Sequence, residues 1–121
     1  MPKHILAVDD SAAIRQVVSH TLHGAGYRVT EAVDGVDALE KAAAAPFDMV
    51  LTDFNMPRLD GLALIGRLRE LPHYRALPML VMSTESSQAV KARGRAAGAS
   101  GWLVKPFEPR RLLEVIALVL G

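Results

Sequence analysis

The chain has 121 residues, a formal net charge of +1 at pH 7 and no cysteine. This length accommodates one domain, and although half of the residues are hydrophobic, no run approaches the roughly 20 apolar residues that span a bilayer. The balanced net charge gives no indication of nucleic-acid binding. The lack of cysteine excludes disulfides and thiolate metal sites, and the N-terminus does not resemble a signal peptide. We therefore expect one cytoplasmic, monomeric domain over residues 1–121, without membrane insertion and without an effector domain.

Short apolar runs alternate with helical patterns and predict five strands and five helices. The strands fall near residues 4–9, 28–32, 48–53, 78–82 and 101–104. The first helix has residues at the i, i+3, i+4, i+7 and i+8 spacing of one face, which we expect to be buried: Ile14, Val17, Val18, Thr21 and Leu22. This helix ends at Gly24-Ala25-Gly26. The others are expected over Val36–Ala44, from Asp60-Gly61 to just before Pro72, over Ser86–Ala97 and from after Pro109 to Leu120.

The alternation of strands and helices predicts repeated βαβ units, and therefore an α/β fold with a parallel sheet covered on both faces. The methionines at 49, 79 and 82 lie in strands and are expected to fill the core. The fourth helix offers only small residues and Val90 for packing, so we expect it to be comparatively mobile. The fifth has more apolar residues than one face can bury. They either pack against neighbouring helices or leave apolar surface for a partner.

Polar residues follow four of the predicted strands at the point where each strand ends. They are Asp9, Asp10, Asp53, Ser83 and Lys105. In a doubly wound sheet, ligands bind beyond the carboxyl ends of the strands, so these side chains should converge there. Clustered carboxylates repel each other unless a cation relieves them, and Mg²⁺ prefers oxygen ligands and shares phosphate oxygens. The set therefore suits a divalent metal and a phosphoryl group.

Each of these residues alone has an ordinary explanation. Asp10 before Ser11 could begin a helix, Asp53 could be a turn residue, and Lys105-Pro106 could be a solvated turn. His20 and His23 are three residues apart, but without a third ligand nearby we interpret them as solvated surface residues. The order of the polar residues along the chain, each after a strand, is what indicates a site.

The chain resembles the receiver domain of bacterial two-component response regulators, and most of all the stand-alone chemotaxis regulators of the CheY type. The motifs that carry the resemblance are Asp9-Asp10, the stretch Leu51–Pro57, Asp60-Gly61, Ser83 and Lys105-Pro106-Phe107. The resemblance implies a flavodoxin-like doubly wound sheet of five parallel strands in the order 2-1-3-4-5, with five helices.

The resemblance also implies the chemistry of the site. Asp53 would accept a phosphoryl group from the phosphohistidine of a histidine kinase. Asp10, Asp53 and the backbone carbonyl of Asn55 would bind Mg²⁺ directly, and Asp9 would act through water. Lys105 would pair with a phosphoryl oxygen, and the peptide bond before Pro106 is expected to be cis.

Ser83 and Trp102 are the switch residues that the resemblance implies. The Ser83 hydroxyl would bind another phosphoryl oxygen and draw its loop inward, and the aromatic residue three positions before the lysine would swing inward with it. Here that residue is Trp102, where tyrosine or phenylalanine is more usual; the alternative is a half-buried packing residue. Asn55, Thr84 and Glu85 occupy positions that tune phosphoryl lifetime, and Thr84 could narrow access to Asp53.

The surface on which the switch is expected to act is basic. Residues 86–121 carry a net charge of +4 and residues 1–85 a net charge of −3. This part of the chain is either an ordinary solvated helix face or a docking face, formed by the fourth helix, fifth strand and fifth helix, for an acidic partner.

The resulting hypothesis is a signalling switch that is phosphorylated on Asp53 and then docks to a target protein in chemotaxis or motility, for example the flagellar motor switch. One alternative is a phosphate sink or phosphorelay intermediate. A phosphohydrolase is disfavoured, because Asp53-Phe54-Asn55 offers no second carboxylate as general acid. We therefore expect a protein that is not an enzyme, apart from catalysing its own phosphorylation and dephosphorylation.

Overall fold

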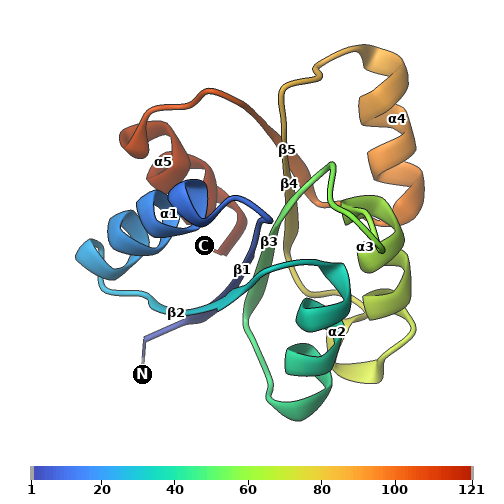
Figure 1. Cartoon of the computed structure of the whole chain (residues 1–121), viewed down its shortest axis with the longest axis horizontal. Helices are drawn as coiled ribbons and strands as arrows, with labels where there is room; N and C mark the ends of the chain where they lie inside the picture. Colours follow the sequence, from blue (N-terminus) through green and yellow to red (C-terminus); the bar gives the residue numbers. More distant parts are fainter. Residues whose placement is uncertain (1, 121) are drawn as a thin grey trace.

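Residues 2–120 are described by a computed structural model, in which five parallel strands form one sheet in the order β2-β1-β3-β4-β5. The strands are β1 (His4–Val8), β2 (Arg28–Ala32), β3 (Met49–Asp53), β4 (Met79–Ser83) and β5 (Gly101–Val104). The helices are α1 (Ala12–Gly24), α2 (Gly35–Ala44), α3 (Gly61–Arg69), α4 (Gln88–Ala97) and α5 (Pro109–Leu120). Helices α1 and α5 cover one face of the sheet and α2, α3 and α4 the other (Figure 1). The expected flavodoxin-like topology is confirmed.

The predicted strand ends are correct to within one residue, but two helices differ from the prediction. Helix α3 ends at Arg69 rather than just before Pro72, because the Leu71 N–H turns back to the Leu68 carbonyl at 2.9 Å. A short 3₁₀ turn over Pro72–Tyr74, which the sequence did not reveal, follows it. Helix α4 starts at Gln88 rather than Ser86, because the Ser87 side chain accepts the Val90 N–H at 3.2 Å and caps the helix.

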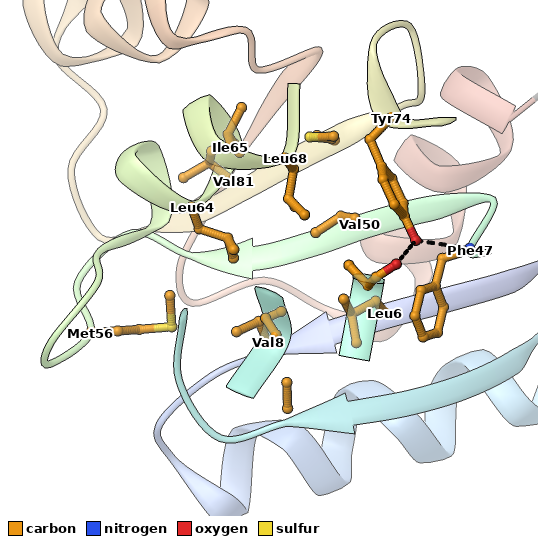
Figure 2. Packing of buried hydrophobic residues seen from close by; sticks show 14 of the residues in the cluster. Leu6, Val8, Phe47, Val50, Met56, Leu64, Ile65, Leu68, Tyr74 and Val81 are labelled. Carbon is orange, nitrogen blue, oxygen red and sulfur yellow. Dashed lines mark hydrogen bonds between the residues drawn. The ribbon is translucent and has the colours of Figure 1, made fainter. Parts of the chain in front are cut away.

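The core lies on both faces of the sheet. Toward α2, α3 and α4, Leu6, Val8, Val50 and Val81 pack against Leu64, Ile65 and Leu68, as Figure 2 shows. Toward α1 and α5, alternate strand residues such as Ile5, Leu51 and Met82 pack against Leu22, Leu112 and Ile116. The three strand methionines are buried, as predicted. No helix within residues 2–120 is long and apolar enough to cross a membrane.

Tyr74 closes the end of the core opposite the carboxyl ends of the strands. Its hydroxyl accepts the Phe47 N–H at 3.3 Å, as Figure 2 shows. It also lies 2.8 Å from each of the carbonyl oxygens of Ala42 and Ala45. The buried phenol therefore satisfies backbone groups where the chain passes from α2 into β3.

The predicted buried face of α1 is too wide. Val18 and Leu22 are buried, but Val17 is 55% exposed, and Ile14 and Thr21 are only half-buried. Adjacent residues of a helix point about 100° apart, and α1 directs Val18 toward the sheet and Val17 toward solvent, whereas α3 buries the adjacent pair Leu64 and Ile65. For α5 the expected excess is confirmed, because Leu118 remains 80% exposed while Leu112 and Ile116 are buried.

Helix α4 is anchored mainly at its C-terminal end. Its buried residues are Val90 and Gly94, in line with the expected weak packing. The guanidinium group of Arg69 donates to the Gly98 carbonyl at 2.6 and 3.1 Å, and to the carbonyls of Tyr74 and Leu77 at 2.7 Å each. Arg69 thus ties the end of α4 to α3 and to the entry of β4, whereas residues 84–87 before α4 are exposed.

Replacing Arg69 with methionine should destabilise the fold by about 2 kcal/mol, because the carbonyls that it satisfies lose a charged donor. Urea unfolding followed by far-UV circular dichroism measures this free energy. Arg67→Met is the matched control, since Arg67 is exposed on the same helix and makes no side-chain hydrogen bond within residues 2–120. Equal unfolding free energies for the two variants would contradict the anchoring role of Arg69.

Candidate functional site

Three carboxylates meet at the carboxyl ends of β1 and β3. These strands are neighbours with Val8 paired to Thr52, so Asp9 and Asp10, which follow β1, lie level with Asp53 at the end of β3. One oxygen from each carboxylate lies within 4.8 Å of the others. Asp9 and Asp53 are 2% and 8% exposed, and Asp10 is open to solvent. The convergence predicted from the sequence is present.

The turn after β1 leaves the Asp10 carboxylate exposed to solvent. Asp9 Oδ1 accepts the Ser11 N–H at 2.9 Å, and Ser11 in turn caps α1 by accepting the Ile14 N–H at 3.3 Å. The capping residue is therefore Ser11, and Asp10 is not used as a helix cap. The guanidinium group of Arg15 also supports this turn, because it donates to the Asp9 carbonyl at 2.6 Å and to Glu31 at 3.3 Å.

The loop after β3 is held by the Asp60-Gly61 pair. Asp60 caps α3 by accepting the Ala63 N–H at 2.8 Å, and the Gly61 N–H bonds the Phe54 carbonyl at 3.0 Å. A Cβ atom at Gly61 would collide with the Asp53 carbonyl oxygen. The glycine is needed because the start of α3 packs directly on the backbone of Asp53. Asn55 lies exposed in this loop.

Lys105 neutralises part of the cluster. Its Nζ lies 3.0 Å from Asp9 Oδ2 and 2.8 Å from Asp53 Oδ1. It is positioned by its backbone N–H, which bonds the Ser83 carbonyl at 2.8 Å, and its peptide bond to Pro106 is cis, as expected. Burial opposes the charge of Lys105, but the hydrogen bonds that its ammonium group donates to Asp53 and Asp9 outweigh burial and raise the pKa of this group.

Burial raises the pKa of Asp53 above the usual carboxyl range. The hydrogen bond from Lys105 opposes this rise in pKa, and the nearby charge of Asp9 adds to it. An ionised Asp53 is therefore costly in the folded protein, and an added cation would lower this cost. Carboxylate and carbonyl oxygens are the ligands that Mg²⁺ prefers, so the residues present fit this ion. His20 and His23 are exposed on α1, and the cluster contains no histidine among residues 2–120.

Ser83 and Trp102 are linked through the loop between β4 and α4. The Ser83 hydroxyl, 2% exposed, accepts the Glu85 N–H at 3.0 Å, and its own O–H remains a donor. The indole N–H of Trp102 donates to the Glu85 carbonyl at 2.8 Å. Both side chains thus hold the backbone of Glu85, Ser83 through its N–H and Trp102 through its carbonyl. Thr84 and Glu85, two of the predicted tuning positions, are exposed in this loop.

The Trp102 ring occupies a notch at Gly94 of α4. A Cβ atom at Gly94 would lie 2.7 Å from the ring, so the unusual glycine within this helix makes room for the larger aromatic residue. The other side of the ring faces Phe54, with ring centroids 5.5 Å apart, and Phe54 directly follows Asp53. Trp102 therefore contacts both the loop after Asp53 and the loop after Ser83, which sequence reasoning did not reveal.

Asp53→Asn should raise the melting temperature at pH 7 without Mg²⁺, and the gain should shrink as the pH falls. The raised pKa of Asp53 means that the folded protein holds its proton to a higher pH than the unfolded chain. Stability is therefore lost as the pH rises from the ordinary carboxyl range through the folded pKa, and asparagine removes this loss. Mg²⁺ should stabilise the wild type more than the variant. Differential scanning calorimetry measures both effects.

The control for this prediction is Glu40→Gln, an exposed carboxylate on α2. A lower melting temperature for Asp53→Asn than for the wild type at pH 7 would contradict the proposed cost of ionising Asp53.

Comparison with known proteins agrees with this geometry. The profile of the response regulator receiver domain matches residues 5–117. The chain is 38% identical over 119 residues to chemotaxis protein CheY1 of Helicobacter pylori, covering 97% of this chain and 96% of that protein. The structure of chemotaxis protein CheY4 of Vibrio cholerae is similar with a TM-score of 0.96 and 47% identity, over 98% of this chain and 99% of that one.

A third similar structure is described with a metal ion. It is the receiver domain of the sensor histidine kinase PA1611 from Pseudomonas aeruginosa, with magnesium coordinated in the active site cleft. It has a TM-score of 0.91 and 28% identity, and the alignment covers 100% of this chain and 99% of that one. Together with the carboxylate cluster and Lys105, these matches establish that the chain belongs to the receiver domain family of response regulators.

Proposed function

We propose that this protein is a CheY-like response regulator, a cytoplasmic switch in which phosphorylation of Asp53 by a histidine kinase controls docking to a target protein. The observation that carries the proposal is the position of Asp53 beside two further carboxylates and Lys105, at the carboxyl edge of the sheet. This arrangement suits the transfer of a phosphoryl group better than the turnover of a substrate. The similarity to two chemotaxis proteins supports a role in chemotaxis or motility.

The phosphoryl transfer follows from the geometry of Asp53. Within residues 2–120, Asp53 accepts hydrogen bonds from Lys105 and from the Phe54 N–H, both on Oδ1, which leaves Oδ2 to bind a metal or to attack. An oxygen of Asp53 forms a bond to phosphorus in line with the breaking P–N bond of the phosphohistidine, and the imidazole, already protonated on its other ring nitrogen, keeps the electron pair of that bond and leaves as a neutral ring. Asp10, Asp53 and the Asn55 carbonyl would hold Mg²⁺, with Asp9 acting through water, and the ion would neutralise the phosphoryl charge when bound.

The loop between β4 and α4 transmits the effect of phosphorylation at Asp53 to Trp102 and α4. The Ser83 O–H donates to a phosphoryl oxygen of phosphorylated Asp53, and this contact draws residues 84–87 toward the site. Because the Glu85 carbonyl holds the Trp102 indole, the movement repositions Trp102 and the exposed start of α4. Asn55, Thr84 and Glu85 are exposed in the loops that follow β3 and β4, and in this proposal they tune the lifetime of the phosphoryl group.

The docking face is formed by α4, β5 and α5. Two hollows meet at Trp102 and Lys91, one of about 170 Å³ between α4 and β5 and one of about 380 Å³ between β5 and α5. Arg95 lines the first, and Arg111 and the exposed Val104 line the second. Three cations against the single carboxylate of Glu108, together with apolar residues such as Trp102 and Val104, suit an acidic amphipathic segment of the target, which the flagellar motor switch would provide in a motility pathway.

A phosphate sink or phosphorelay intermediate is the second candidate. The observation that favours it is the similarity to the receiver domain of a sensor histidine kinase. In that role the phosphoryl group would pass from Asp53 to another histidine, and phosphorylation would not change the affinity for a target.

Wild-type protein should incorporate acid-labile phosphate from acetyl phosphate in the presence of Mg²⁺, and Asp53→Asn should incorporate none. EDTA should abolish the reaction of the wild type, because the phosphoryl charge then lacks neutralisation. Intact-protein mass spectrometry detects the addition, and Trp102 fluorescence follows the switch. Phosphate incorporation by Asp53→Asn at the wild-type rate would refute the assignment of Asp53.

An acidic amphipathic peptide should bind the phosphorylated protein more tightly than the unphosphorylated one, and Lys91→Glu or Arg111→Glu should weaken this binding about three- to tenfold. Fluorescence anisotropy of a labelled peptide at two salt concentrations measures the change. Arg75→Glu, an exposed charge after the 3₁₀ turn, is the control and should leave affinity unchanged. Peptide affinity that does not depend on phosphorylation would favour the phosphate sink.

A further inference from the structure

The loop that carries Asn55 has a strained tip. Residues 54–60 connect β3 to α3, and the base of the loop is closed by the bond from the Gly61 N–H to the Phe54 carbonyl. At the tip, the Leu59 N–H donates to the Pro57 carbonyl at 2.8 Å, and Arg58 between them has a φ of 69°. A three-residue turn around a positive φ is rare and strained, and it persists only where the surroundings hold it.

An ion pair with the β2–α2 turn holds this tip. The Arg58 guanidinium group donates to Asp34 Oδ2, and Asp34 Oδ1 accepts the Asp37 N–H at 2.8 Å to cap α2. The Asp37 N–H and Arg58 together lower the pKa of Asp34, so this carboxylate is charged at neutral pH. The Arg58 side chain is 61% exposed, but that of Asp34 is only 10% exposed, so the anchor itself is well fixed.

The backbone contact beside this ion pair is equally close. A Cβ atom at Gly35, the first residue of α2, would collide with the Leu59 carbonyl oxygen. The start of α2 therefore lies directly against the loop, and α2 and α3 lie side by side (Figure 1). Among residues 2–120, the bond from Arg58 to Asp34 is the only side-chain hydrogen bond that residues 55–59 make.

Support at this tip matters because Asn55 would bind the metal through its backbone. A side-chain ligand can be reoriented by its own rotamers, but the position of a backbone carbonyl depends on the shape of the whole loop. We propose that Arg58 and Asp34 are positioning residues that hold residues 54–60 in the shape that Mg²⁺ requires, and so set the affinity for Mg²⁺. The inference rests on the proposed magnesium site and adds two residues that contact neither the metal nor the phosphoryl group.

A purely electrostatic role for Arg58 predicts the opposite result. Arg58 is a cation near a cation site, so its charge alone should weaken Mg²⁺ binding, and removing it should tighten binding. A positioning role predicts that removing the guanidinium group weakens binding, because the strained tip relaxes. The sign of the change in affinity therefore separates the two roles.

Mg²⁺ affinity, measured by isothermal titration calorimetry at constant ionic strength, tests the inference. Arg58→Gln should weaken binding about three- to fivefold, in line with the modest strength of a partly exposed ion pair. Arg58→Lys should restore most of the affinity, because the lysine ammonium group can still pair with the Asp34 carboxylate. Asp34→Asn, in which asparagine still caps α2, should weaken binding to a similar extent.

The double variant Arg58→Gln with Asp34→Asn should bind no more weakly than either single variant, since both remove one interaction. Arg67→Gln is the matched control, because it removes an exposed arginine from neighbouring α3 and should not weaken binding. Unchanged or tighter Mg²⁺ binding by folded Arg58→Gln, or additive losses in the double variant, would overturn the proposal.

Phosphorylation by acetyl phosphate separates this inference from the proposed function. At saturating Mg²⁺, Arg58→Gln should be phosphorylated at the wild-type rate, and at limiting Mg²⁺ more slowly. If Asp53 is phosphorylated but Arg58→Gln binds Mg²⁺ as tightly as the wild type does, only the positioning role of Arg58 is refuted. If the wild type binds Mg²⁺ but incorporates no phosphate, the proposed function is refuted. The Mg²⁺ affinities of the wild type and Arg58→Gln still test the role of Arg58 in that case.

Discussion

The interaction on which the rest of the site depends is the balance between three converging carboxylates and Lys105. The carboxyl ends of β1 and β3 bring Asp9, Asp10 and Asp53 together. Lys105, which follows the edge strand β5, bridges Asp9 and Asp53. One ammonium group cannot neutralise three carboxylates, and burial keeps the pKa of Asp53 raised. The folded protein therefore retains a negative site whose unfavourable energy a divalent cation can relieve.

The loops around the carboxylate cluster connect Asp53 to the segment that precedes α4. Asp53 lies next to Phe54, which contacts Trp102, and Trp102 bonds the same peptide segment that the Ser83 hydroxyl holds. Helix α4, next to this segment, is fixed at its C-terminal end by Arg69 and only lightly packed elsewhere. A new charge on Asp53 would thus act on the part of the molecule that has the least packing to resist movement.

Two further features of the structure lie around the carboxylate cluster. Trp102 requires the notch at Gly94, so the size of the aromatic residue and the absence of a side chain on α4 are matched. Arg58 occupies a strained backbone conformation that depends on Asp34, a residue from a different part of the chain. Neither feature contributes an atom to the carboxylate cluster.

The sequence by itself determined the strands and helices, and hence that Asp9, Asp10, Asp53, Ser83 and Lys105 meet at one edge of the sheet. Periodicity and the common direction of parallel strands suffice for this, because both depend on local pattern. Only the tertiary structure decided that Lys105 bridges Asp9 and Asp53, that Val17 faces solvent and that Arg58 pairs with Asp34. These outcomes depend on contacts between residues that are distant in sequence and on where each helix lies on the sheet, and neither leaves a periodic signal in the chain.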